Sequence, residues 1–410
     1  MKYFLMTLCT ALFLMSCKKD DDVSPPSMDV GQQDPATNQG RVPCEGGFAD
    51  GFPCGDYDLM SRVTLSEMNA EGGNDCWGWT DPSSGMEYAI MGLGNGTAFI
   101  NVSNPEQPVY LGKLPTATVD SPWRDIKVYQ NHAFIVSEAL EHGLQVFDLT
   151  QLRNVTSPKA FSAFTVLEDF GSAHNIVINE DTGFAYVVGT KSTFNGGLHI
   201  VDIRNPKNPI TVGGFGGDGY THDAQAVVYD GPDPDYFGRE IVAASNENTV
   251  TLVDVTNKDN PVLISKISYT NPGYTHQGWF TPDHRYFVAN DELDERDFGF
   301  RTRTLLFDFE DLDNPRVMGT YLGSTNAIDH NHYINGNLLS MSNYNAGVRF
   351  LSTTDIANGT LEEIGFFDTH PENNITDFKG SWSNYPFFES GNIVISDINR
   401  GLFIVRRSGT

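Results

Sequence analysis

Residues 173–215, AHNIVINEDTGFAYVVGTKSTFNGGLHIVDIRNPKNPITVGGF, decide the fold of this chain. The stretch contains four short apolar runs, which are NIVI, FAYVV, LHIVDI and PITVGGF. The segments between the runs are rich in glycine, asparagine and proline, which favour turns. Four short apolar runs separated by turns predict one four-stranded antiparallel meander.

The end of the third run recurs along the chain. The phrases VFDLT, IVDIR, LVDVT and LFDFE each lead, through a short polar turn, to Pro158, Pro209, Pro261 and Pro315. The period of about 50 residues lies at the upper end for propeller blades and is too long for most solenoid repeats. A continuous repeat over most of 410 residues favours one large closed domain over several separate ones.

Seven meanders follow one another along the chain. We expect them at residues 75–114, 124–164, 173–215, 222–268, 276–322, 329–368 and 379–407. The seventh has only three strands, and residues 57–66 near the amino end resemble a fourth strand without three before it. A ring of blades leaves exposed edges unless the two chain ends pair. The sequence therefore predicts an all-β, seven-bladed β-propeller of four-stranded antiparallel blades over residues 44–410, closed by an N-terminal strand that completes the last blade.

The first residues resemble a targeting signal. Lys2 precedes an apolar run, residues 3–15, that is too short to span a bilayer, and Leu-Met-Ser-Cys at residues 14–17 resembles a bacterial lipobox. We expect residues 1–16 to be a lipoprotein signal peptide, Cys17 to be lipidated and residues 17–43 to form a flexible tether. A plain secretory signal is the alternative.

The charged residues after Cys17 resemble the tag that sends some lipoproteins of the Bacteroidetes type to the outer face of the outer membrane. We therefore expect a lipid-anchored protein of the outer membrane that is exposed at the cell surface. The net charge of −27 disfavours nucleic acid as a partner. We expect a monomer whose partner, besides the membrane, is an extracellular protein or glycan.

Cysteine usage fits export. Cys44 and Cys54 flank a glycine-rich loop and could close a small disulfide in an oxidising compartment. Cys76 would then be left over. Three pairings among these cysteines stay open on the sequence.

Histidines and carboxylates gather at one predicted face of the ring. In a propeller, the first strand of each blade starts at one face, and the loop between the second and third strands opens there too. The residues that this places at the channel mouth are His174, His222, Asp223, His276, His330, His332, Asp291 and Glu292. Imidazole beside carboxylate suits a divalent metal of the zinc or manganese class, whereas carboxylates alone suit calcium. The repeated histidine is equally explained by a blade-to-blade hydrogen bond copied with the repeat.

Enzyme motifs are mostly absent from the sequence. It has no G-x-S-x-G elbow, no H-E-x-x-H, no P-loop and no Rossmann glycine fingerprint between strand and helix. The catalytic residues, if any, are therefore unknown. One pairing stays open, in which His276 acts as the acid and Asp223 or Glu292 as the base.

Six runs carry a resemblance to a known family. They are WGWTDPSSGMEYAIMG, WRDIKVYQNHAFIVSEALEHGLQVFDL, GSAHNIVINEDTGFAYVVGT, YTHDAQAVVY, YTHQGWFTPDHRYFVANDELDE and AIDHNHY. From Cys44 to its end, the chain resembles the choice-of-anchor B family of LVIVD-repeat proteins. The resemblance implies a β-propeller on the cell exterior and no established reaction. Cys76 departs from the family pattern, which has an aliphatic residue before Trp-Gly-Trp.

These observations lead to three expectations for function. The first is a binding or scaffold propeller at the cell surface, with a divalent-metal or ligand site at the channel mouth. The second is a metal-dependent hydrolase or lyase that acts on an extracellular glycan or peptide at the same face. The third is a purely structural envelope protein.

Overall fold

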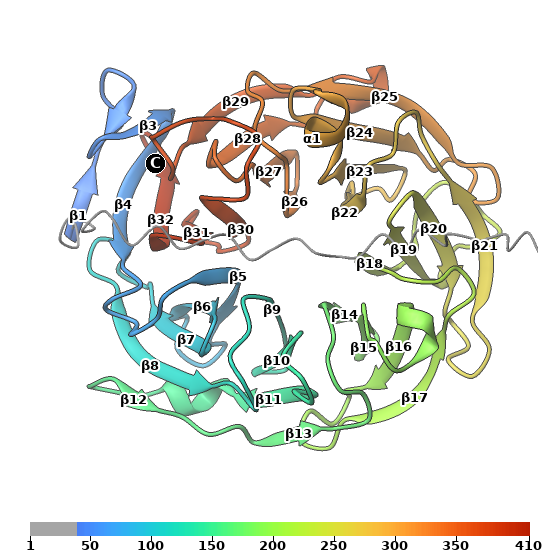
Figure 1. Cartoon of the computed structure of the whole chain (residues 1–410), viewed down its shortest axis with the longest axis horizontal. Helices are drawn as coiled ribbons and strands as arrows, with labels where there is room; N and C mark the ends of the chain where they lie inside the picture. Colours follow the sequence, from blue (N-terminus) through green and yellow to red (C-terminus); the bar gives the residue numbers. More distant parts are fainter. Residues whose placement is uncertain (1–38) are drawn as a thin grey trace, which may run out of the picture.

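The computed structural model describes residues 39–410, which form seven β-sheets around a central channel (Figure 1). The predicted seven-bladed propeller of four-stranded antiparallel blades is correct. The predicted lipidation site Cys17 and the signal peptide lie outside the described residues. No helix among residues 39–410 is long and apolar enough to cross a bilayer.

The third blade shows how the sequence becomes a meander. Its strands, from the channel outward, are β14 (Asn175–Asn179), β15 (Phe184–Val188), β16 (Leu198–Asp202) and β17 (Ile210–Phe215). The register pairs Asn175 with Val188 and Phe184 with Asp202. Gly183 makes the first turn at φ +71°, a left-handed conformation that favours glycine. The apolar runs therefore became strands and the intervening polar segments became turns.

The other blades repeat this order. Blade one has β5 (Gly73–Thr80), β6 (Glu87–Leu93), β7 (Gly96–Asn101) and β8 (Val109–Pro115), and blade two has β9 (Arg124–Tyr129), β10 (His132–Ser137), β11 (Leu144–Asp148) and β13 (Thr165–Leu167). Blade four has β18 (Asp223–Val228), β19 (Glu240–Asn246), β20 (Thr249–Asp254) and β21 (Val262–Ile267), and blade five has β22 (Thr275–Phe280), β23 (Tyr286–Asp291), β24 (Arg303–Asp308) and β25 (Arg316–Leu322). Blade six has β26 (His332–Asn335), β27 (Leu338–Ser342), β28 (Val348–Ser352) and β29 (Glu362–Phe367).

The two ends of the chain close the ring in blade seven. This blade has β30 (Ser381–Tyr385), β31 (Ile393–Asp397) and β32 (Gly401–Arg407) from the carboxyl end, and β4 (Tyr57–Val63) from the amino end. β4 pairs antiparallel with β32, from Leu402 opposite Val63 to Arg407 opposite Tyr57. The predicted closing strand is therefore correct, and it removes an exposed edge that would otherwise be open to non-native pairing.

The residues before β4 differ from the expected tether. Residues 39–42 form β1 (Gln39–Val42), which pairs with the outer edge of β4, so these residues belong to the propeller and not to a tether. Arg41 Nε donates to Asp58 Oδ2 at 2.7 Å, which fastens β1 to the blade. An open strand edge attracts a further strand because its backbone groups lack partners.

A short hairpin, β2 (Phe48–Ala49) and β3 (Phe52–Gly55), extends blade six beyond β29. A disulfide joins Cys44 to Cys54 and ties this hairpin to the segment that follows β1. Cys76 is a free cysteine and is buried. The amino-terminal segment therefore contributes strands to two neighbouring blades.

The core lies between neighbouring blades. Between blades one and two, Phe99 stacks on Phe147 at 4.5 Å between ring centroids, and Phe161 packs edge-on against both. Each fully buried side chain of this kind contributes about 1.5–3 kcal/mol through removal of apolar surface from water. This packing fixes the angle between blades and hence where each first strand begins.

Aromatic side chains on or next to the first strands of blades one, five, six and seven form a cluster. Tyr333 lies between Trp77 and Trp279, with ring centroids 5.5 and 5.0 Å away, and Phe387 contacts all three rings. These ring contacts connect blade one with blades six and seven.

Candidate metal centre

Four imidazoles form an arc at the channel mouth. His174, His222, His276 and His330 come from four consecutive blades, each at the start of a first strand. Their ring centroids are 4.1, 4.2 and 4.3 Å apart in that order. The predicted convergence of these four residues therefore holds as geometry.

Hydrogen bonds between blades orient two of these rings. His222 Nδ1 lies 3.0 Å from the carbonyl oxygen of His276, and His330 Nδ1 lies 2.5 Å from that of Trp382. A carbonyl can only accept, so in both rings we assign the proton to Nδ1 and the lone pair to Nε2. The copied blade-to-blade hydrogen bond is thus present, and it also prepares Nε2 as a ligand atom.

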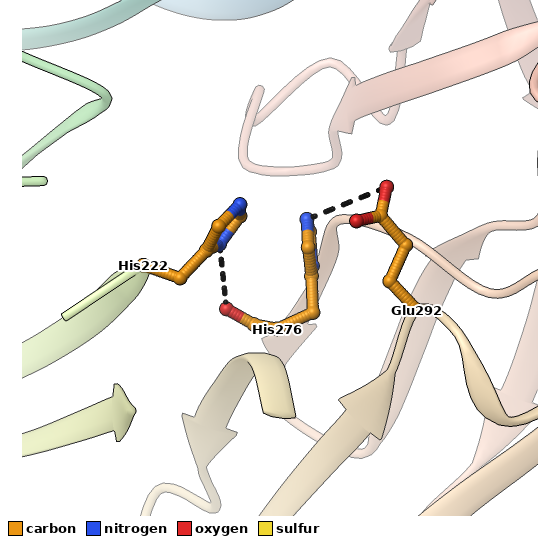
Figure 2. A group of neighbouring side chains, drawn as sticks. All are labelled: His222, His276 and Glu292. Atoms are coloured by element: carbon orange, nitrogen blue, oxygen red, sulfur yellow. Dashed lines mark hydrogen bonds and ion pairs between the residues drawn. The ribbon is translucent and has the colours of Figure 1, made fainter. Parts of the chain in front are cut away.

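Glu292, directly after β23, brings a carboxylate to this arc. Its Oε1 lies 4.0 Å from His276 Nε2 and 3.5 Å from His330 Nε2, and it accepts a 2.8 Å hydrogen bond from the Tyr344 hydroxyl. Figure 2 shows the side chains of His222, His276 and Glu292 grouped together. One ligand atom from each of these three lies within 4.8 Å of the other two.

Burial sets the protonation of this cluster. His276 is 1% exposed, and the pKa values of His222 and His276 lie well below the usual imidazole value because burial penalises the charged form. Burial also lowers the pKa of His330 to about 3 and raises that of Glu292 to about 7. The three imidazoles are therefore neutral at pH 7 and suited to bind a cation.

His174 differs from the other three histidines. Its Nδ1 lies 2.5 Å from Glu138 Oε1 in the loop between β10 and β11. Burial alone would lower its pKa, but the hydrogen bond and charge of Glu138 outweigh burial and raise it. His174 and Glu138 therefore form an ion pair at the end of the arc.

Asp223 belongs to a second tier of the channel, one residue further along the first strands. Asp75, Asp125 and Asp223 surround Lys127 there, and Lys127 Nζ lies 2.7 Å from Asp125 Oδ1 and 3.8 Å from Asp75 Oδ2. The ammonium also lies over the Trp77 ring at 4.7 Å from its centroid. We call this group the carboxylate tier and the His222, His276 and Glu292 group the histidine tier.

The structure does not bring Asp291 or His332 into the histidine tier. Asp291 accepts hydrogen bonds from the Tyr269 hydroxyl and from the backbone N–H groups of Gly273 and Tyr274, so it holds a neighbouring loop. His332 lies inside β26, where its Nε2 bonds to the carbonyl of Val288 in blade five at 3.0 Å. Both were expected at the mouth from their chain positions, but Asp291 is bonded to the loop before β22 and His332 is bonded to blade five.

Two contributing residues escaped the sequence analysis. Lys127 follows Asp125 by two positions on one strand, so the two-residue period of a strand places both on the channel side. Tyr344 lies in the turn between β27 and β28, which opens on the mouth face as the Glu292 loop does. Both residues could have been found from the sequence. The alternation of side chains along a strand predicts the position of Lys127, and the matching loop in each blade predicts that of Tyr344.

Comparisons with known proteins agree with the fold. The LVIVD repeat family model matches residues 170–215, which contain blade three. Among curated protein sequences, none matches the chain. The β-propeller domain of Cps50 (Swd1) from Myceliophteria thermophila aligns with a TM-score of 0.52 and 8% identity, over 82% of this chain and 97% of that one.

A protein from Lactobacillus plantarum aligns with a TM-score of 0.52 and 14% identity, over 79% of this chain and 88% of that one. At these identities the likeness concerns the fold alone. The repeat match falls on the stretch whose four apolar runs first indicated a blade. The chain is a β-propeller that carries an LVIVD repeat at residues 170–215.

Proposed function

We propose that this protein is a binding or scaffold propeller of the cell surface that holds a divalent transition metal in the histidine tier. The observation that carries the proposal is the convergence of His222, His276 and Glu292, whose ligand atoms lie within 4.8 Å of one another. A neutral imidazole and an ionised carboxylate each present a lone pair that a cation can bind. Burying such groups together without a proton or a cation between them is costly.

The donor set favours zinc or manganese over calcium, because two of the three ligands are imidazole nitrogens. Tetrahedral zinc ligands stand about 3.3 Å apart, given zinc–nitrogen bonds of ~2.0–2.1 Å. The side chains would therefore move about 1 Å inward on binding. His330, whose Nε2 lies 3.5 Å from Glu292 Oε1, is the candidate for a fourth ligand.

A second function, a metal-dependent hydrolase or lyase acting on an extracellular glycan or peptide, is favoured by the ligand type. Two histidines and one glutamate are the protein ligands of several catalytic zinc sites, which keep one position open for water or substrate. A site closed by His330 favours the binding module instead. The coordination number of the loaded metal separates the two.

The surface location is part of the same proposal and rests on the sequence. The lipobox-like residues 14–17 and the acidic residues after them support lipidation of Cys17 and an outer-membrane anchor. An extracellular protein or glycan as partner, and a monomeric state, follow from the same expectations. Mass spectrometry of the mature amino terminus tests the anchor, because lipidation leaves a diacylglyceryl-cysteine at Cys17.

The test of the metal site measures metal content of the purified full-length protein by mass spectrometry, after incubation with zinc or manganese and removal of excess. We expect one metal per chain in the wild type, and loss of it in His276→Ala and Glu292→Gln. His284→Ala is the matched control. His284 Nδ1 pairs with Asp230 Oδ1 at a distance of 2.7 Å, and neither residue belongs to the histidine tier. Chelation should lower stability by about 2.7 kcal/mol if free metal stood at 100 times its Kd. Wild-type protein that retains neither metal would refute the site.

A further inference from the structure

An open groove of about 430 Å³ lies at the rim of blade six, apart from the histidine tier. It is formed by β28, β29, the connection from β25 to β26 and the connection from β29 to β30, with Pro53 of β3 at its edge. Both connections lie on the mouth face. The volume falls within the range of about 300–1,000 Å³ that small-molecule sites occupy.

Arg349 on β28 is the unusual member of this groove. The residue is 6% exposed, yet its Nε has no hydrogen-bond partner among residues 39–410. Among the described residues its guanidinium makes one hydrogen bond, from Nη1 to Glu363 Oε1 at a long 3.5 Å. A buried guanidinium normally satisfies its five N–H donors. The Arg349 guanidinium, which lines the groove, therefore has donor capacity that no described residue uses.

The groove also offers acceptors and an apolar surface. The carboxylates of Glu363 and Asp368 line it, and the exposed Asn373 carboxamide stands on its outer lip. Phe366 lies beneath the Arg349 guanidinium, 4.5 Å from its ring centroid, and holds the guanidinium plane in place. Pro53 and Pro371 add apolar walls.

Charge decides between ligand classes. Two carboxylates and one guanidinium line the groove, and the whole chain has a net charge of −27. An anionic ligand is therefore disfavoured. A neutral polyol suits the lining, because each hydroxyl both donates and accepts while its carbon-bound hydrogens lie on apolar walls. Planar side chains with fixed polar edges recognise pairs of adjacent hydroxyls.

We propose that this groove binds a neutral saccharide, with the Arg349 guanidinium edge donating to adjacent hydroxyl oxygens and Glu363 and Asp368 accepting from hydroxyls. The site is independent of the histidine tier and requires no metal. It assigns the protein a carbohydrate-recognition surface on the face that also carries the channel mouth.

The experiment is saturation-transfer difference NMR on the purified full-length protein with maltose, cellobiose, lactose and N,N′-diacetylchitobiose, all in the presence of a chelator. We expect transfer to at least one disaccharide. Arg349→Lys keeps the positive charge but loses the planar guanidinium, which can donate two parallel hydrogen bonds. We expect it to weaken saccharide binding about tenfold. Asn373→Ala, on the exposed lip, should weaken it by a smaller factor.

The control is Tyr236→Ala in a second groove, where Arg239 and Asp254 also meet apolar walls. This variant should bind as the wild type does. Transfer to none of the four disaccharides, or binding that both groove variants leave unchanged, would overturn the proposal. Because a chelator is present throughout, these outcomes do not depend on the metal site.

Discussion

The two tiers of the channel use similar groups but balance their charge differently. In the carboxylate tier, Lys127 lies among Asp75, Asp125 and Asp223, so the chain supplies its own cation. In the histidine tier, Glu292 lies 4.0 and 3.5 Å from the neutral imidazoles of His276 and His330, and His174 and Arg296 act on it through their charge alone. One tier is complete as folded, and the other has the polarity of a site that accepts a cation.

The pKa shifts follow this difference. Burial alone would raise the pKa of Asp125, but the charge of Lys127 outweighs burial and lowers it. Burial keeps the pKa of Asp75 well above its usual value, and burial with the charge of Asp125 raises that of Asp223 to about 7. One lysine therefore supports the ionised form of one carboxyl group, whereas burial favours the protonated form of the other two. Glu292, with a pKa of about 7, has no such lysine.

Removal of the internal cation should produce the largest effect. Lys127→Met leaves the buried Asp125 carboxylate without its partner, and we expect a loss of about 3–5 kcal/mol in the free energy of unfolding. Urea denaturation at pH 7 measures it. The double variant with Asp125→Asn should regain most of the loss, because the uncompensated charge is gone.

Lys191→Met is the control for this variant. Its side chain is 73% exposed and lies 3.9 Å from Glu138, so its removal should change stability by no more than about 0.5 kcal/mol. If Lys127→Met were as stable as Lys191→Met, the carboxylate tier would not need an internal cation, and the contrast between the tiers would fail.

The two tiers also show how much of the fold and of the site could be predicted from the sequence. The blades were predictable because turn residues and the repeat of about 50 residues mark each strand, and the convergence of four histidines followed because all first strands begin at one face. The roles of Asp291 and His332 were not predictable in this way. Chain position places a residue at the mouth, but packing against the next blade decides where its side chain points.

The predicted end of the tether at residue 43 differs from the structure for a related reason. Residues 39–42, Gln-Gly-Arg-Val, have neither alternation nor strong β propensity, yet they form β1. The strand forms because the outer edge of β4 offers unpaired backbone groups and Asp58 binds Arg41. Pairing that depends on an available edge cannot be read from a local pattern.

Blade two offers a test of how pH acts near the mouth. Arg124 lies at the position where blades three to six have histidine, and its Nη1 donates to His142 Nε2 at 2.8 Å. His142 donates from Nδ1 to the carbonyl of Gly143, so the ring is neutral. Burial and the charge of Arg124 lower its pKa to about 4.

The low pKa of folded His142 makes the stability of the protein depend on pH. The unfolded chain protonates His142 near pH 6.5 and the folded chain only near 4, so stability contributed by the neutral ring is lost as pH falls between these values. We expect His142→Gln to reduce the stability difference between pH 6.5 and 5 by about 2 kcal/mol. Urea midpoints at the two pH values measure it. An unchanged difference would show that the folded protein protonates His142 as readily as the unfolded chain does.

The smallest effect should come from a residue that only positions the proposed ligand Glu292. Tyr344→Phe removes the hydroxyl that donates to Glu292 Oε1 at 2.8 Å but keeps the ring beside His330. Groups that orient metal ligands contribute about 10- to 100-fold in affinity, and we expect the weaker end, about tenfold for zinc in a chelator-competition titration. Tyr186→Phe is the matched control, because it loses a hydroxyl bonded to Glu240 at 2.6 Å in a different part of the propeller. Equal zinc affinity in both variants would mean that Glu292 needs no orientation by Tyr344, and that the histidine tier, unlike the carboxylate tier, is not held in a fixed geometry by its neighbours.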